Sequence, residues 1–208
     1  MSTPEQYALV VPVKTLSRAK SRLQGFTDHV RRDLVQAFAM DALSAAMASP
    51  LVSGLHVVTD EPDLAKAART LGCSVVGDAG GGDLNRALRS AVTSLTPRCG
   101  TRRPVAAMLG DLPCLVTDDL TDALASVDGT GFVADAAGIG TTLLAVADPA
   151  DFDPRFGPSS RAAHLAAGYA ELALALPTLR LDVDTAGDLA SAVAVGVGPH
   201  TRTVLDAT

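Results

Sequence analysis

The chain alternates short apolar runs with longer amphipathic stretches, and this alternation limits the folds that it can adopt. The apolar runs, which predict strands, are Ala8–Val13, Leu55–Thr59, Ser74–Val76, Val105–Leu109, Gly131–Ala134, Thr142–Val146 and Arg180–Val183. The amphipathic stretches, which predict helices, are Val30–Ala48, Pro62–Leu71, Leu84–Leu95, Thr117–Ser126, Arg161–Tyr169 and Ala186–Gly196. Their order predicts an α/β fold with a mostly parallel sheet covered by helices on both faces. In such sheets ligands bind beyond the carboxyl ends of the strands, so the loops that leave the strands are where a site is expected.

The composition is that of a globular protein. With 208 residues, we expect one domain that spans residues 1–208 and buries a substantial core. The hydrophobic fraction of 48% and the charged fraction of 19% are typical of this class. Aromatic residues make up only 3% and Trp is absent, so the core must rely on Ala, Val and Leu.

Charge and cysteine usage exclude several classes of function. A net charge of -6 argues against general nucleic-acid binding, which needs a basic surface, although it allows one local cationic pocket. Cys73, Cys99 and Cys114 are odd in number and lack CxxC spacing, which favours reduced thiols and no structural zinc. The first six residues lack the positive region of a signal peptide, and the apolar stretch that follows is too short to span a membrane. We expect no membrane partner and a cytoplasmic location.

Four cations follow the first expected strand within nine residues: Lys14, Arg18, Lys20 and Arg22. The chain has only three lysines, and two of them lie here. Lys supplies a compact point charge and Arg a planar fork of donors, and both suit phosphate groups. The cluster therefore predicts a phosphate-binding loop, whereas the simpler interpretation is a solvated loop after an edge strand.

Carboxylates end two of the later apolar runs. Asp111 follows the uncharged Val105–Leu109, and a carboxylate there is costly unless it is paired or bound to a metal. Asp182 and Asp184 alternate along the last expected strand, so they should point to the same side. Mg²⁺ binds a few carboxylates and completes its shell with water and phosphate oxygens. The simpler alternatives are a turn residue for Asp111 and a helix cap for Asp184.

Three glycine-containing segments are further candidates for a site. Gly80–Gly82 precedes Asp83-Leu84-Asn85, and its glycines would let backbone approach a ligand closely. Gly138–Thr141 has the composition of a hairpin turn. Phe156–Arg161 leads into an expected helix, with Ser159 or Ser160 as its N-cap. On the sequence alone, an ordinary turn is the simpler explanation for Gly138–Thr141 and an ordinary cap for Phe156–Arg161, and a cap would also explain Asn85. His164, within that helix, is expected to be a packed or surface residue.

Together these segments resemble a known family. The motifs are Val11-Pro12-Val13-Lys14, Ala19-Lys20-Ser21-Arg22-Leu23, Asp83-Leu84-Asn85-Arg86-Ala87-Leu88, Gly110-Asp111-Leu112-Pro113, Phe156-Gly157-Pro158-Ser159-Ser160 and Asp182-Val183-Asp184-Thr185. In this order they are similar to the guanylyltransferases of coenzyme F-420 biosynthesis, the 2-phospho-L-lactate guanylyltransferase family, whose actinobacterial members use phosphoenolpyruvate. The resemblance runs from residue 8 to about 198. Each motif alone is weak, but jointly they are specific.

The resemblance implies a fold, a reaction and a set of site residues. The fold would be a Rossmann-like nucleotidyltransferase of the glycosyltransferase-A-like type, with a mixed, mostly parallel sheet. The reaction would join GMP from GTP to a phosphorylated three-carbon acid, with release of pyrophosphate and Mg²⁺ as cofactor. The residues implied are Lys14, Lys20 and Arg22 for catalysis, Lys14, Lys20, Asp83 and Asn85 for the nucleotide, Thr141, Gly157 and Ser160 for the acid, and Asp111, Asp182 and Asp184 for the metal. Family members often carry an acidic residue where this chain has Ser159.

The sequence leaves several alternatives for the acceptor and for the class of protein. Phosphoenolpyruvate is favoured as the acceptor, but 2-phospho-L-lactate and 3-phosphoglycerate differ from it by few atoms. A guanylyltransferase for the molybdenum cofactor would carry a Gly-rich loop after the first strand, whereas Thr15–Leu23 has no Gly. A sugar-nucleotide glycosyltransferase would carry Asp-x-Asp where Gly110-Asp111-Leu112 stands. A non-catalytic nucleotide-binding partner of a downstream F-420 transferase is a different class, and an enzyme could also hand its product to such a transferase.

Overall fold

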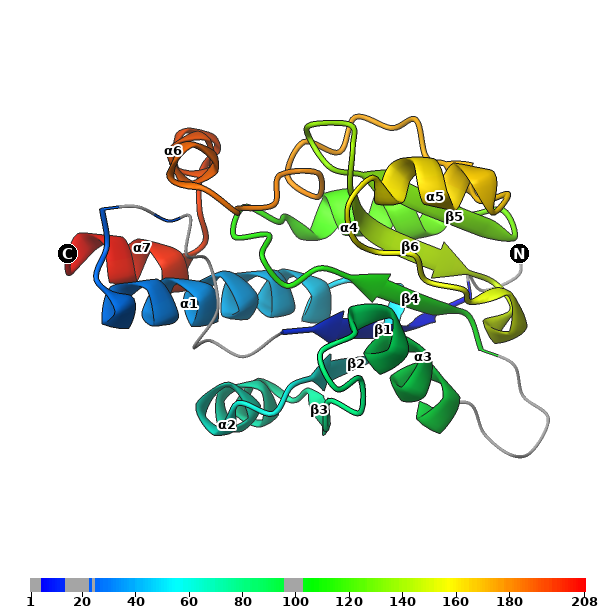
Figure 1. Cartoon of the computed structure of the whole chain (residues 1–208), viewed down its shortest axis with the longest axis horizontal. Coiled ribbons are helices and arrows are strands. Elements are labelled where there is room, and N and C mark those ends of the chain that lie inside the picture. Colours follow the sequence, from blue (N-terminus) through cyan, green and yellow to red (C-terminus); the bar gives the residue numbers. More distant parts are fainter. Residues whose placement is uncertain (1–4, 14–22, 24, 96–102) are drawn as a thin grey trace.

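The computed structural model describes residues 5–13, 23, 25–95 and 103–208. Its centre is a seven-stranded sheet with the order β3-β2-β1-β4-β6-β5-β7 (Figure 1). The strands are β1 (Tyr7–Pro12), β2 (Val52–Val58), β3 (Ser74–Val76), β4 (Val105–Met108), β5 (Thr130–Ala134), β6 (Thr141–Val146) and β7 (Ala170–Glu171). The expected mixed and mostly parallel sheet is confirmed.

Strand β6 runs against its neighbours. It pairs antiparallel with both β4 and β5, whereas β1 pairs parallel with β2 and β4, and β5 pairs parallel with β7. Leu143 of β6 lies opposite Met108, the last residue of β4, and the Leu109 N–H donates to the Thr142 carbonyl at 2.9 Å. The first residue of β6, Thr141, therefore lies at the edge of the sheet where the parallel strands end.

Helices cover both faces of the sheet (Figure 1). They are α1 (Asp28–Met47), α2 (Pro62–Leu71), α3 (Leu84–Leu95), α4 (Thr117–Ala125), α5 (Ser160–Ala166), α6 (Ala186–Val195) and α7 (Pro199–Asp206), with a 3-10 turn at Pro149–Asp151. Alternate residues of β1 enter different cores, as the two-residue period of a strand requires. Leu9 and Val11 pack with residues of α1, α2 and α4, whereas Val10 packs with residues of α3.

A third cluster lies around the C-terminal part of the chain. It joins Leu34 and Phe38 of α1 to Cys114, Val183 and Leu189, all of which are buried. Val183 is fully buried, and its backbone N–H donates to the Asp111 carbonyl at 3.0 Å. This packing holds the chain before α6 against the loop that leaves β4, beside the carboxyl ends of the central strands.

The element pattern expected from the sequence is largely confirmed, with three corrections. Arg180–Val183 is not a strand of the sheet, because it is tied to its neighbours only at its ends, where the Ala136 N–H donates to Arg180 and Val183 donates to Asp111. The helix expected over Arg161–Tyr169 ends at Ala166, before Gly168, which adopts a φ of 87°. Strand β7 and helix α7 were not expected, since two residues carry too little pattern for a strand and α7 follows the expected α6 closely.

A buried carboxylate fastens α7 to α1. Asp41 is only 5% exposed, and its two oxygens accept from the backbone N–H groups of His200 and Thr201, each at 2.9 Å. Gly198, at the start of α7, fits because a Cβ there would meet the Asp41 carboxylate at 2.4 Å. Asp41 thus satisfies helix-start N–H groups that have no partner within their own helix. Among the described residues, no helix is long and apolar enough to cross a bilayer.

We predict that Asp41→Ala destabilises the protein by about 2 kcal/mol or more, because the buried Thr201 N–H and the part-buried His200 N–H lose a charged acceptor. Urea denaturation would measure the change. Asp33→Ala is the matched control on the same helix, since the Asp33 side chain is 45% exposed, and it should stay within about 0.5 kcal/mol of the parent. Equal losses in the two variants would contradict this role for Asp41.

Candidate active site

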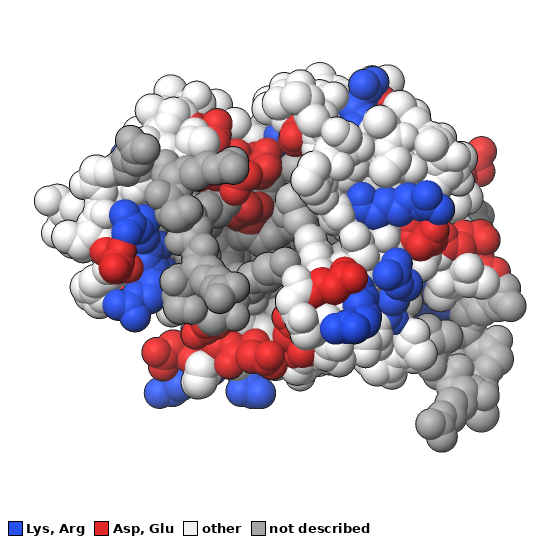
Figure 2. Space-filling view, viewed as in Figure 1, with Lys and Arg blue, Asp and Glu red and all other residues white. Residues whose placement is uncertain are grey.

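The expected site residues gather at the edge of the sheet where the parallel strands end. Asp111 follows β4, Asp135 follows β5, and Thr141 begins β6. The backbone bond from Val183 to Asp111 brings Asp182 and Asp184 to the same place. Because Val183 is buried between them, its two acidic neighbours stand on the outer side of the segment. Figure 2 shows acidic side chains gathered beside a hollow in this face of the molecule.

These carboxylates perturb one another. The pKa of Asp182 is raised from 3.8 to about 7, chiefly by burial and then by the negative charges of Asp111, Asp184 and Asp135. Like charges that are forced together in a partly buried place favour the protonated form. Among the described residues, no group of three such side chains is close enough together to form a metal cage. The cluster therefore has the negative charge that attracts a cation, but its carboxylates do not by themselves form a complete set of metal ligands.

Asp184 does not cap the helix that follows it. The N-cap of α6 is Thr185, whose hydroxyl accepts from the Asp188 N–H at 3.2 Å while the Asp188 carboxylate accepts from the Thr185 N–H at 2.8 Å. This reciprocal capping box removes the simpler explanation for Asp184. Its side chain is exposed at the acidic cluster.

The glycine turn before β6 is held by Asp135. One carboxylate oxygen accepts from the Ile139 N–H and the other from the Gly140 N–H, both at 2.8 Å. A Cβ at Gly140 would approach the Asp135 carboxylate to 2.5 Å, so a larger residue there would have to displace the carboxylate that holds the turn. The turn delivers Thr141, which is 2% exposed, to the strand-end edge.

The irregular segment before α5 is held by side chains that come from elsewhere in the chain. The Tyr169 hydroxyl donates to the Asp151 carbonyl at 2.6 Å and accepts from the Asp153 N–H at 2.8 Å. The Asn85 amide accepts from the Phe156 N–H at 2.8 Å and donates to the Phe156 carbonyl at 2.9 Å. These contacts fix the backbone that leads to Gly157, whose φ is 136°.

The start of α5 lies against the glycine turn. Ser159 is the N-cap residue, with a left-handed φ of 57° and no hydrogen bond from its side chain to the helix. The Ser160 N–H donates to the Gly157 carbonyl at 3.1 Å, and the Arg161 N–H donates to the Ile139 carbonyl at 3.0 Å. The structure therefore brings together Thr141, Gly157 and Ser160, the three residues predicted to hold the acid.

The loop before α3 has an internal framework of its own. The Asp83 carboxylate accepts from the Arg86 N–H at 3.1 Å, a contact that lowers the pKa of Asp83. The Arg86 guanidinium donates to the Gly80 carbonyl. A Cβ at Gly80 would lie 2.3 Å from the Asp83 carbonyl, so the loop needs Gly there. Asp83 and Asn85 thus both have structural partners, and their contact with a nucleotide stays a prediction.

The predicted phosphate-binding cations Lys14, Arg18, Lys20 and Arg22 lie outside the described residues. Their roles stay predictions. The residues on either side of this gap are well placed for the expected site: Val13 and Leu23 are both buried, and the Val13 N–H donates to the Val58 carbonyl at 2.9 Å. Val13, the last described residue before the gap, therefore lies at the same strand-end edge as the acidic cluster.

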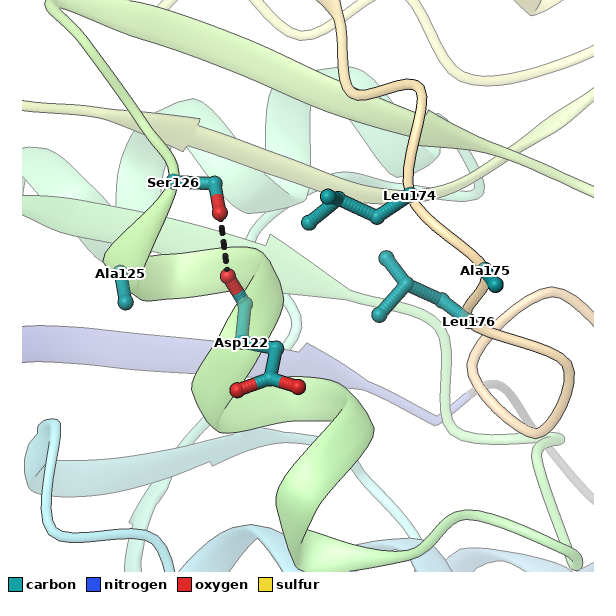
Figure 3. Close-up of a pocket in the computed structure, with 6 residues that line it drawn as sticks. All are labelled: Asp122, Ala125, Ser126, Leu174, Ala175 and Leu176. Carbon is teal, nitrogen blue, oxygen red and sulfur yellow. Dashed lines mark hydrogen bonds between the residues drawn. The ribbon is translucent and has the colours of Figure 1, made fainter.

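A second hollow, of about 350 Å³, lies away from this edge, between the end of α4 and residues 174–176 (Figure 3). Leu174 and Leu176 face Asp122 and Ser126 across it, and the Ser126 hydroxyl donates to the Asp122 carbonyl at 2.8 Å. Because α4 begins after the exit of β4, its last residues lie toward the opposite edge of the sheet. None of the predicted site residues lines this hollow.

Two residues that support the site were not singled out from the sequence, and a third was set aside. Asp135 holds the turn before Thr141, and Tyr169 holds the segment before Gly157. His164, expected to be packed or at the surface, is fully buried and contacts Thr141. The position of Asp135 at the end of an apolar run could have identified it. No local pattern marks the other two.

The acidic cluster yields a prediction about stability. Between pH 3.8 and about 7 the folded state keeps the Asp182 proton while the unfolded state loses it, so this group lowers stability as the pH rises and its full cost applies above pH 7. At pH 8 in EDTA, we expect Asp182→Asn to raise Tm by roughly 2–4 °C for each kcal/mol of relieved repulsion. Millimolar Mg²⁺ should raise the parent's Tm and leave that of the variant nearly unchanged.

Differential scanning calorimetry with and without Mg²⁺ measures both effects. Asp128→Asn is the control, because Asp128 is exposed in the turn after α4, and it should respond to Mg²⁺ as the parent does. An Asp182→Asn variant that is less stable than the parent at pH 8, with an undiminished response to Mg²⁺, would contradict the assignment of Asp182 to the cation-attracting cluster.

Comparisons with known proteins agree with the fold and identify the family. A solved Methanothermobacter nucleotidyl transferase is 19% identical, with a TM-score of 0.59 over 98% of this chain and 99% of that chain. A solved 4-diphosphocytidyl-2C-methyl-D-erythritol synthase is 12% identical, with a TM-score of 0.63 over 92% of this chain and 99% of that chain. At these identities the likeness shows the fold alone.

Sequence relatives are much closer. Phosphoenolpyruvate guanylyltransferase of Streptomyces coelicolor is 47% identical over 96% of this chain and 95% of its own length, and the Thermomonospora curvata protein of the same name is 45% identical over 94% and 86%. The family model described as "Guanylyl transferase CofC like" matches residues 7–207. This chain, which joins a nucleotidyltransferase fold to a strand-end acidic cluster, belongs to the CofC-like guanylyl transferase family.

Proposed function

We propose that this chain is a phosphoenolpyruvate guanylyltransferase, which joins GMP from GTP to the phosphate of phosphoenolpyruvate and releases pyrophosphate. The observation that carries the proposal is the 47% identity, over nearly the whole chain, to relatives of that name. The alternative acceptors 2-phospho-L-lactate and 3-phosphoglycerate share the anionic groups of phosphoenolpyruvate, and an assay with each acid distinguishes them. We also propose that the product serves coenzyme F-420 biosynthesis, through hand-off to a downstream transferase, in the cytoplasm.

In this proposal the acid lies among Thr141, Gly157 and Ser160. This placement is supported by the proximity of the three residues. The backbone hydrogen bond from Arg161 to Ile139 joins the start of α5 to the turn before Thr141. The Thr141 hydroxyl and nearby backbone N–H groups are neutral donors, and such donors suit the carboxylate and phosphate of a small acid. Asp83 and Asn85 would then border the nucleotide, on the loop that adjoins Phe156.

Mg²⁺ fits the acidic cluster, and Asp111, Asp182 and Asp184 would hold it. The raised pKa of Asp182 supports this assignment, because a nearby cation would relieve the repulsion that causes it. Mg²⁺ is commonly bound by one or two carboxylates and by substrate phosphates, so a complete protein cage is not required. Bound there, the ion would neutralise charge on the phosphates that meet in the reaction.

The reaction is a displacement at the α-phosphorus of GTP. An oxygen of the acid's phosphate forms the new bond to this phosphorus, the bond to the β-phosphate oxygen breaks, and pyrophosphate leaves with that electron pair. Two anions must approach one another, so catalysis consists mainly of positioning and charge neutralisation. Lys14, Lys20 and Arg22 would take the triphosphate side. The attacking oxygen is already ionised, so the proposal needs no general base.

Release of pyrophosphate tests the function directly. The purified chain would be incubated with GTP and Mg²⁺ and with phosphoenolpyruvate, 2-phospho-L-lactate or 3-phosphoglycerate in turn, and pyrophosphate and the guanylyl diester would be measured. We expect the highest kcat/KM with phosphoenolpyruvate. Turnover with none of the acids would support a non-catalytic nucleotide-binding protein, and a clear preference for another acid would overturn the proposed acceptor.

Thr141→Val should raise KM for phosphoenolpyruvate by roughly 10-fold or more and that for GTP by less than about twofold, because a hydrogen bond to a charged group is worth about 1.5–3 kcal/mol. Steady-state kinetics with each substrate varied would measure the two constants. Thr142→Val is the matched control: Thr142 is equally buried, but its hydroxyl donates over 3.5 Å to the Val133 carbonyl and does not contact His164 in the described structure. Similar increases for both substrates would argue against Thr141 as a ligand of the acid.

Lys20→Ala should lower kcat/KM by about 10²-fold or more, as the loss of a charge that stabilises the transition state can do. Lys66→Ala is the control, because it removes the only lysine outside the first loop, which lies on helix α2 and is not one of the predicted site residues. A Lys20 variant with altered thermal stability and normal turnover would support a purely structural loop.

A further inference from the structure

We propose that His164 is a positioning residue of the acid subsite: it fixes Thr141 as a hydrogen-bond donor to the bound acid and holds the adjoining backbone at Arg155. This inference rests on the proposed function, in which Thr141 contacts the acid. His164 itself would not touch the substrate.

His164 lies at the junction of the segments that form the subsite. Its side chain, from α5, is fully buried. Its Nδ1 lies 2.9 Å from the Thr141 hydroxyl oxygen, and its Nε2 lies 3.0 Å from the backbone nitrogen of Arg155. One imidazole therefore links α5, the start of β6 and the segment that leads to Gly157.

The two contacts determine which ring nitrogen carries the proton. The Arg155 N–H can only donate, so Nε2 must accept and cannot carry a proton. In the neutral ring the proton is then on Nδ1, which donates to the Thr141 oxygen. The Thr141 hydroxyl has no other hydrogen-bond partner within the described part of the chain. Its own proton is thereby left for an acceptor outside that part, such as an oxygen of the acid.

The surroundings keep the ring neutral and in place. Phe132, Phe156 and Tyr169 pack around it, with ring centroids 5.5, 5.5 and 5.6 Å from that of the imidazole. The whole chain has only five Phe and two Tyr, so this cage uses a large share of its aromatic residues. Burial and then the charge of Arg155 lower the pKa of His164 to about 4, although a hydrogen bond to the Ser160 backbone and then the charge of Asp153 act in the opposite direction.

A positively charged His164 would be the wrong form for this task. Protonation of Nε2 would set its N–H against that of Arg155 and break the link to the segment before Gly157. An imidazole that stays neutral keeps both contacts throughout the range in which the substrates are ionised. His164 therefore fixes the direction of the hydrogen bond that the Thr141 hydroxyl can make, so that this hydroxyl donates to the acid. It also holds the backbone of the neighbouring segment at Arg155.

Three substitutions separate the two contacts. His164→Leu removes both. His164→Asn places an amide near the position of Nδ1, so it can keep a contact with Thr141. His164→Gln reaches further and can keep a contact with Arg155. All variants would be checked by circular dichroism and thermal unfolding and assayed well below their Tm, with His56→Leu, a half-buried histidine of β2, as the matched control.

With the Leu variant we expect a rise of about 10-fold or more in KM for phosphoenolpyruvate and a change of less than about twofold in KM for GTP, with Asn recovering part of the loss. Equal changes in both constants, or a lower Tm with normal kinetics, would overturn the proposal. If the parent itself releases no pyrophosphate with any acid, the proposed function fails. An active parent with kinetically normal His164 variants overturns the positioning role alone.

A measurement without turnover tests the same inference, even if the Leu variant does not fold. In ¹⁵N-labelled parent protein, NMR of the imidazole nitrogens should show the proton on Nδ1 from pH 5.5 to pH 8. The His56→Leu spectrum would identify the signals of the half-buried His56. A His164 ring that carries its proton on Nε2, or that titrates near pH 6.5, would overturn the proposal.

Discussion

The antiparallel pairing of β6 between β4 and β5 is the constraint on which the site depends. A parallel strand would deliver its first residue to the far edge of the sheet, away from the ends of its neighbours. Because β6 is reversed, Thr141 comes to the edge where β4 leads to Asp111 and β5 leads to Asp135. One reversal thus places neutral donors beside a cluster of carboxylates. In the proposed reaction the donors would bind the acid, and the carboxylates would bind the cation.

The sequence predicted the sheet and most helices because their patterns are local. α2 and α3 were predicted at their observed bounds, since α2 has Pro at its start and Gly after its end, and α3 has a strongly periodic apolar face. Arg180–Val183 was predicted to be a strand because an apolar run with alternating carboxylates has the right period. Among the residues that the structure describes, no strand lies beside it along its length, and a partner strand is not a property of the run itself.

The sequence identified acidic residues of the candidate site, but not the contacts that join its parts. Asp111, Asp182 and Asp184 were identified because a carboxylate at the end of an apolar run is costly unless it is paired or bound to a cation. Their mutual repulsion depends on the contact of Val183 with Asp111, which joins residues 72 positions apart in the chain. His164 and Tyr169 act through backbone groups of a segment with no regular structure, so neither has a periodic pattern that could identify it.

The side chains that hold residues 151–156 set a limit on how this enzyme could be redesigned. The segment makes no helix or sheet beyond its first turn, and its shape is imposed by Tyr169, His164 and Asn85 through bonds to its backbone. A designer who wished to change the accepted acid could exchange this loop for that of another family member. The new loop would then lack the side chains that hold its backbone in shape. A successful graft would have to carry residue 85, 71 positions before Phe156, together with the two residues that follow the loop.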